Sequence, residues 1–275
     1  MSTADNKYYL PNDELEAAVE SLTIYSNTLL FEFAKHSDEI KDIIIRDFIA
    51  RGIVLLRSIT YLWTKKCYSD ANILSRSLVD RLIHLIYLVD TNTFTEYKEW
   101  SFVKQYEQRN RARSIPEFRD SLNLSEWKDT EEEKSKYSEY KNRNLQWKRP
   151  NPEEIMKNRG LGFLYTLGYD YGSMHVHPMA DDGLEEFKLL TNVEEVQSQE
   201  DQRSMINNSC LILSMIIQEG FNAGTLNWRK ICYDFLDDIR EHLSSGSDNY
   251  KICFLKIGKL LENGEALCCE GNQKI

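Results

Sequence analysis

The sequence predicts an all-α fold, an up-and-down multi-helix bundle with a projecting helical hairpin. Five prolines and twelve glycines in 275 residues are few, which favours long helices over a β architecture with many turns. Apolar residues also recur with helical spacing through most of the chain. Because 41% of the residues are hydrophobic, the chain can build a sizeable core, and we expect a single helical domain over residues 1–275 with a hairpin insertion at about 93–149.

Two helices are expected in the first part of the chain, over residues 12–35 and 40–66. The first begins after Pro11 and carries a continuous apolar stripe. The second contains Gly52, and because glycine costs about 1 kcal/mol relative to alanine inside a helix, it indicates a close helix crossing or a kink. A tight turn then leads into a third helix, so the second and third helices should form an antiparallel hairpin.

The third helix, residues 69–90, is the most strongly patterned in the chain. Apolar side chains cover more than half of its circumference, which is typical of a mostly buried helix. The opposite sector carries polar side chains, among them Arg76, Asp80 and His84 at four-residue spacing. Because unpaired buried charges cost several kcal/mol, these groups must pair inward or line a cleft. In the structural interpretation, an Arg76–Asp80 ion pair and a His84 hydrogen bond satisfy one another.

The expected hairpin consists of two polar helices, one ending near residue 114 and the other running from 125 to 147. Between Lys98 and Arg149 there are 13 Lys or Arg residues against 10 Asp or Glu, a local charge of +3 in a chain of −10. Aromatic residues lie among these charges, a pattern that can bind single-stranded nucleic acid, RNA included, through phosphate pairing and base stacking. The alternative is that the aromatics pack between the two helices of the hairpin itself.

The remaining chain is expected to contain a short helix after Asn151, a segment rich in Gly and Tyr that ends near Pro178, and an acidic connection. The Gly- and Tyr-rich segment holds Ser173, His175 and His177. Three more helices are predicted over residues 202–223, 228–243 and 249–261.

Several classes of protein are disfavoured by what the sequence lacks. No apolar run approaches the roughly 20 residues of a membrane span, and the first residues do not resemble a signal peptide, so we expect a cytoplasmic protein without membrane contact. The six cysteines match no zinc-ligand spacing and are expected to be reduced, with Cys268 and Cys269 in a frayed tail. Phosphate-loop, dinucleotide and hydrolase-elbow motifs are absent, and no cofactor is predicted.

Two chemistries fit a cluster in which the Ser173–His177 segment meets the third helix. In the first, His177 is a general acid or base, Arg76 stabilises the charge that develops on phosphorus, and Asp80 orients one of them. His84 and Ser173 support this site, and the reaction is metal-independent cleavage of RNA by its own 2′-hydroxyl. In the second, a metal-dependent hydrolase uses a transition metal, with these ligands: Asp80, His84, His175 and His177.

The motif Leu74-Ser75-Arg76-Ser77-Leu78-Val79-Asp80 resembles the "Leu-x-Arg-Ser-Leu-x-Glu" helix of a large bacterial family labelled as a domain of unknown function, with Asp80 in place of the usual Glu. Tyr171-Gly172-Ser173-x3-His177-Pro178 resembles the second motif of that family, and the likeness covers roughly residues 45 to 185. More remotely, the architecture is similar to the HEPN helical proteins, many of which are RNA-cleaving toxins in defence and toxin–antitoxin systems.

This resemblance implies a bacterial effector that acts as an endoribonuclease toxin in antiviral defence or the stress response. It also implies a homodimer or another protein partner, since related helical proteins often dimerise. The alternative is a non-enzymatic interaction module in which the Arg, Asp and His cluster is structural.

Overall fold

The computed structural model describes residues 10–115, 128–143, 147–174, 176–177, 183–191 and 203–269. The fold is all-α, as predicted, and the β structure of the described residues is one antiparallel pair of two-residue strands, β1 (Asn227–Trp228) and β2 (Cys268–Cys269). The chain forms two compact units, one made of residues 1–87 with 150–275 and the other of residues 88–149. No helix among the described residues has both the length and the apolar character needed to cross a membrane.

The first unit holds most of the helices. Its long helices have the bounds α1 (Asn12–His36), α2 (Ile40–Thr64), α3 (Tyr68–Thr91, of which the last residues belong to the second unit), α11 (Arg203–Ala223), α12 (Lys230–Ser245) and α13 (Asn249–Glu262). Its short helices are α7 (Pro152–Asn158), α8 (Gly162–Leu164), the π-helix η1 (Tyr165–Asp170), α9 (Tyr171–Met174) and α10 (Leu184–Thr191). The long helices lie within a few residues of their predicted positions.

Two segments of the first unit differ from the prediction. Residues 162–174, described from the sequence only as rich in Gly and Tyr, form the continuous helical segment α8–η1–α9, and part of the expected acidic connection is helix α10. The expected frayed tail is also wrong for Cys268, which lies in β2 and is buried. For residues 162–174 and for Cys268, contact with other parts of the first unit orders residues whose composition alone did not indicate regular structure.

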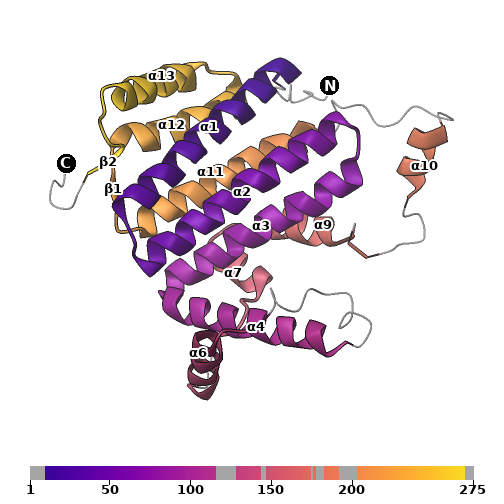
Figure 1. Cartoon of the computed structure of the whole chain (residues 1–275). Helices are drawn as coiled ribbons and strands as arrows, with labels where there is room; N and C mark the ends of the chain where they lie inside the picture. Colours follow the sequence, from indigo (N-terminus) through magenta and orange to yellow (C-terminus); the bar gives the residue numbers. More distant parts are fainter. Residues whose placement is uncertain are drawn as a thin grey trace. The chain divides into compact units, whose positions relative to one another are not determined.

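The core of the first unit is built by α1, α2 and α11, which lie side by side, with α12 packed on α1 and α11 and α13 packed on α12 (Figure 1). The crossing of α2 and α11 is close at two glycines. A Cβ on Gly52 would lie 2.8 Å from Leu213 Cδ1, and one on Gly220 would lie 2.6 Å from Ile45 Cγ2. The predicted close crossing at Gly52 is therefore confirmed.

Buried polar groups also join the helices of the first unit. The carboxylate of Asp42, at the start of α2, accepts hydrogen bonds from Thr225 N at 2.9 Å and from the hydroxyls of Ser37 and Thr225. Tyr25 in α1 donates its hydroxyl to the carbonyl of Cys232 in α12 at 2.8 Å. Since buried polar groups are costly unless paired, these bonds fix how the helices pack.

The second unit contains α4 (Phe94–Ser114) and α6 (Glu131–Asn142). Helix α6 begins later than predicted, because Thr130 and Glu133 form a capping box at Glu131. Arg113 joins the two elements by a two-pronged bond to Asp129. The aromatic residues of this unit pack on one another, with ring centroids 4.2–5.0 Å apart in the pairs Tyr106–Tyr137, Trp100–Trp147 and Tyr97–Trp147. This packing favours the structural interpretation of the aromatics over an open stacking surface for RNA.

Candidate functional site

The segment α8–η1–α9, residues 162–174, packs directly against α3 in the antiparallel direction. Two glycines permit this approach, since a Cβ on Gly168 would lie 2.8 Å from Val79 Cγ2, and one on Gly172 would lie 2.6 Å from Arg76 Cβ. Any larger residue at these two positions would push the segment away from α3. The segment therefore has two faces along α3, one polar and one apolar, and each contributes to a candidate site.

On the polar face, Arg76 is held by two residues of the segment. Its Nε donates to Ser173 Oγ at 2.7 Å, and its guanidinium lies over the ring of Tyr169, 4.4 Å from the centroid. Ser173 Oγ in turn donates to the carbonyl of Tyr169 at 2.7 Å. We call Arg76, Tyr169 and Ser173 the arginine clamp. The structure thus brings together Arg76 and Ser173, two of the residues predicted for the site.

Asp80 and His84 continue the polar face along α3. His84 Nδ1 lies 2.8 Å from the backbone carbonyl of Asp80 and 3.5 Å from its carboxylate Oδ1. Because a carbonyl oxygen only accepts, Nδ1 carries the proton in the neutral ring and Nε2 is the acceptor. The expected ion pair between Arg76 and Asp80 is not seen among the described residues, since Asp80 pairs with His84 and Arg76 with Ser173.

The other predicted histidines do not join this cluster in the part of the chain that the structure describes. His177 is exposed, and within the described ranges it makes no hydrogen bond or ion pair with Arg76 or Asp80. His175 lies outside the described residues. Among described residues, Asp80, His84 and His177 do not gather as metal ligands, so the four-ligand metal site has no support there.

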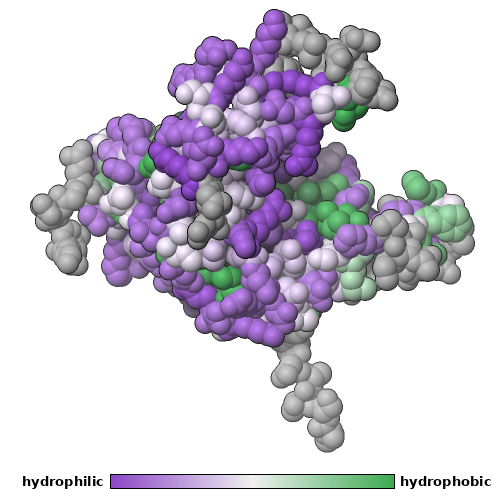
Figure 2. Space-filling model, turned by 90° about the horizontal axis from the view of Figure 1, so that it is seen from below, coloured by the Kyte–Doolittle hydropathy of each residue, from purple (hydrophilic) through white to green (hydrophobic). Residues whose placement is uncertain are grey.

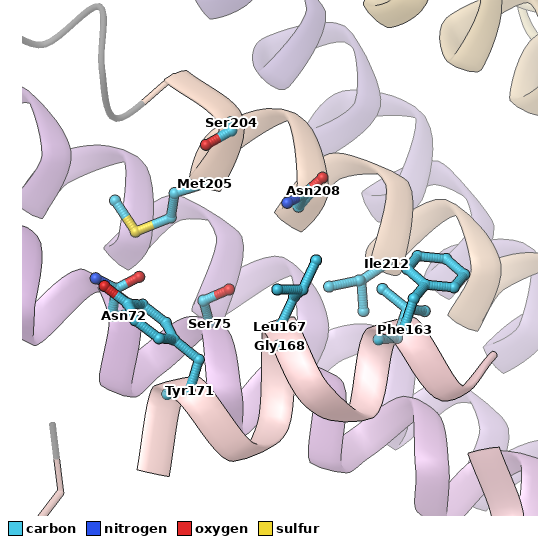
Figure 3. A pocket seen from close by; sticks show the side chains of 12 residues that line it. Asn72, Ser75, Phe163, Leu167, Gly168, Tyr171, Ser204, Met205, Asn208 and Ile212 are labelled. Carbon is cyan, nitrogen blue, oxygen red and sulfur yellow. The ribbon is translucent and has the colours of Figure 1, made fainter. Parts of the chain in front are cut away.

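On the apolar face, the segment borders a cavity of about 580 Å³ between α3 and α11. Figure 3 shows Asn72 and Ser75 of α3, Leu167 and Tyr171 of the segment, and Ser204, Asn208 and Ile212 of α11 around it. The walls combine apolar side chains with polar groups of Asn72, Ser75, Ser204 and Asn208, and ligand sites also combine the two kinds of group. Sequence reasoning missed this cavity because it assigned no helix to the Gly- and Tyr-rich segment.

A repeat in the sequence does carry a signal for the cavity. Phe163, Leu167 and Tyr171 recur every four residues, and Gly168 and Gly172 follow the last two of them. Such spacing predicts one apolar helical row beside a glycine row that packs closely. The apolar row remains 60%, 68% and 51% exposed, respectively. Figure 2 shows that apolar residues gather in patches on a face that is otherwise mostly hydrophilic.

Comparison with known proteins identifies a family. The model of the Family of unknown function (DUF5677) matches residues 42–193, more than half of the chain, and the chain belongs to this family. The predicted resemblance to an uncharacterised family is therefore confirmed. The matched region includes α3 and the segment 162–174, hence the arginine clamp and part of the cavity wall. No curated protein and no solved structure matches the chain, and the likeness to HEPN proteins stays a prediction.

Proposed function

We propose that this member of a family of unknown function binds RNA at the arginine clamp and cleaves it without a metal ion. The observation that carries the proposal is the way in which the Arg76 guanidinium is held. Its Nε is bonded to Ser173 and one face is covered by Tyr169, whereas its two Nη groups bond no residue in the described ranges. A guanidinium fixed in this way presents a pre-oriented edge to two oxygens of one phosphodiester group.

Two histidines are candidates for the proton transfers. His84 presents Nε2 as an acceptor because its Nδ1 is committed to the carbonyl of Asp80. His177 follows Ser173 by four residues and is exposed. In the proposed reaction, a neutral imidazole takes the proton of the RNA 2′-hydroxyl, and the 2′-oxygen attacks phosphorus. The bond to the 5′-oxygen breaks, and that oxygen takes up a proton from the imidazolium, directly or through water. The imidazole is neutral again, and the products are a 2′,3′-cyclic phosphate and a 5′-hydroxyl end.

The tyrosines of the segment supply a surface for bases beside the clamp. Tyr165 and Tyr169 stack with ring centroids 5.7 Å apart, and Arg76 lies against the second of them. Aromatic rings beside a cation are the usual components of sites for single-stranded nucleic acid. The formal charge of −10 opposes nonspecific attraction to RNA, so we expect binding that depends on this local arrangement.

The test is cleavage of end-labelled single-stranded RNA by the purified chain in the presence of EDTA. We expect cleavage with 2′,3′-cyclic phosphate ends, and we expect it to be lost in Arg76→Lys, because lysine keeps the charge but lacks the two-pronged edge. His84→Ala and His177→Ala, made separately, identify the base. Arg51→Ala, which changes an exposed arginine of α2, is the matched control. The proposal is wrong if the unaltered chain does not cleave RNA, or if folded Arg76→Lys protein cleaves at the original rate.

A second candidate function, self-association as an interaction module, is favoured by the exposed apolar residues. Besides the row beside the cavity, α10 exposes Leu184, Phe187 and Leu190. A short helix with apolar anchors can lie in an apolar groove, which is a common mode of helix recognition. We therefore infer that α10 of a second copy binds beside Leu167 and Tyr171. In this interpretation the arginine clamp has a structural role only.

The oligomeric state tests this second candidate. In analytical ultracentrifugation we expect a dimer for the unaltered chain and a monomer for both Leu167→Glu and Phe187→Glu, since a buried unpaired charge opposes association. Phe31→Glu alters an aromatic residue of α1 that is even more exposed than Phe187, and it should leave the dimer intact. A monomeric unaltered chain, or dimers in all variants, contradicts this candidate.

A further inference from the structure

Three residues with metal-binding side chains meet at the end of α1. Glu32 and His36 lie one turn apart near its C-terminus, and Cys268 lies in β2, far away in sequence. One ligand atom from each residue lies within 4.8 Å of the other two. We call these residues the Glu-His-Cys trio. They are separate from the arginine clamp and from the four residues predicted as metal ligands.

The trio is largely withdrawn from solvent. The side chains of Glu32 and His36 are 9% and 16% exposed, and Cys268 is 5% exposed. His36 Nε2 lies 3.9 Å from Glu32 Oε2, and Cys268 Sγ lies at the same distance from that oxygen. These groups therefore face one another in a largely buried space, where a cation would interact with them more strongly than in bulk water.

The imidazole of His36 is a second, independent observation. Its Nε2 is buried and has no hydrogen-bond partner among the described residues. A buried polar atom left without a partner costs about 1–3 kcal/mol, so its position calls for an explanation. Glu32 Oε2, by contrast, accepts a hydrogen bond from Leu267 N at 2.7 Å, which holds the carboxylate in place beside the histidine.

We propose that the Glu-His-Cys trio binds a zinc ion. Thiolate sulfur, imidazole nitrogen and carboxylate oxygen are the three ligand types that zinc accepts in proteins, at about 2.0–2.3 Å. Around a tetrahedral ion, bonds of this length place neighbouring ligand atoms about 3.3–3.8 Å apart. The two separations of 3.9 Å are close to these values, so small side-chain movements complete the geometry.

Binding has a defined proton balance. The thiol of Cys268 loses its proton to solvent as the zinc–sulfur bond forms, and His36 coordinates through the lone pair of Nε2 in its neutral form. Three protein ligands leave the fourth tetrahedral position to a water molecule. Binding is therefore expected to weaken as the pH falls and protons compete for the ligands.

The position of the trio indicates what the ion would do for the fold. Strand β2 pairs with β1, with Cys268 opposite Trp228, and the trio connects this pair to the end of α1. An ion that binds the folded chain but not the unfolded chain raises the free energy of unfolding. Above Kd, this increase grows with the logarithm of the zinc concentration. The proposed role is therefore structural, a link between the first helix and the last strand of the described chain.

Metal analysis of the purified full chain tests the proposal. We expect about one zinc per chain when the protein is prepared without chelators, in accordance with a single site of this type. We expect a lower melting temperature after chelation, and its recovery on adding zinc sulfate. In the chelated protein, Co²⁺ should give the visible absorption bands of a tetrahedral thiolate complex.

Variants separate the trio from other cysteines. His36→Ala and Cys268→Ser should each lose the zinc and the Co²⁺ bands. Cys253→Ser is the matched control, because that buried thiol donates to Asp238 Oδ2 at 2.9 Å and serine can replace the bond. If Cys268→Ser does not fold, His36→Ala alone decides. Absence of zinc binding to the unaltered chain, or unchanged binding in His36→Ala, overturns the proposal.

Discussion

Replacing Gly172 by alanine should separate the segment 162–174 from α3. The added Cβ would lie 2.6 Å from Arg76 Cβ and 3.3 Å from the carbonyl oxygen of Asn72. Non-bonded carbon atoms prefer about 3.5–4.0 Å, so the segment must move outward by about 1 Å. Because Cβ and the carbonyl group are close to the main chain of α3, a side-chain rotation cannot relieve this contact.

The movement also breaks the arginine clamp. The Arg76 Nε to Ser173 Oγ distance is 2.7 Å, and an increase of about 1 Å takes it beyond hydrogen-bond range. Overpacking costs about 1–3 kcal/mol, and loss of a hydrogen bond to a charged group costs about 1.5–3 kcal/mol. The better helix propensity of alanine returns about 1 kcal/mol. Since Arg76 is half-buried, we take the lower value of each cost and expect the free energy of unfolding to fall by about 1.5 kcal/mol.

Urea unfolding followed by circular dichroism measures this loss. Gly258→Ala is the matched control, because Gly258 lies inside α13 and a Cβ there meets nothing within 4 Å. That variant should be unchanged or more stable by up to about 1 kcal/mol. If Gly172→Ala is as stable as Gly258→Ala, the close packing of the segment on α3 is refuted.

Two further predictions concern a charged pair and a buried hydroxyl. The hydrogen bonds from Arg113 hold the pKa of Asp129 below its ordinary value. The pair should therefore stabilise the second unit at pH 7. This stabilisation should be lost as the pH falls below about 4, the ordinary range of that carboxyl. In urea titrations, Asp129→Asn should therefore cost about 1.5–3 kcal/mol at pH 7 and progressively less in acid, and a pH-independent difference would contradict the linkage. Tyr25→Phe removes the bond to the Cys232 carbonyl and should lower the free energy of unfolding by about 1 kcal/mol. Tyr61→Phe, at an exposed tyrosine, should have no effect, and equal losses in both variants would show that the buried bond contributes nothing.

The sequence predicts the long helices well because their apolar residues recur at 3.6-residue spacing, as in α1 and α2. It also predicts the close crossing at Gly52, since a glycine inside a helix needs a packing reason. The segment 162–174 was missed because its glycines and tyrosines are poor helix formers in isolation. Their helical conformation depends on contact with Val79 and Arg76, which local propensity does not contain.

The candidate site was predictable only in part. Periodicity placed Arg76, Asp80 and His84 on one face of α3, but it could not show that Arg76 pairs with Ser173 in preference to Asp80. That preference depends on which segment packs against the helix. The Glu-His-Cys trio left no spacing signal at all, because its third member is far from the other two in sequence and is placed by the pairing of β1 with β2.

The π-helix η1 makes the arginine clamp tolerant of one change in chain length. A π-helical turn accommodates about one residue more than an α-helical turn, so η1 acts as an insertion inside the helical segment. Six residues of π-helix turn the chain through about the same total angle as five residues of α-helix, so deleting one residue ahead of Tyr169 would restore regular α-helix and leave Ser173 on the side that faces Arg76. Deleting a second residue would leave no π-turn to absorb the change, and the following residues would rotate by about 100° around the axis. Ser173 would then leave the side that faces Arg76, although every side chain of the clamp would still be present.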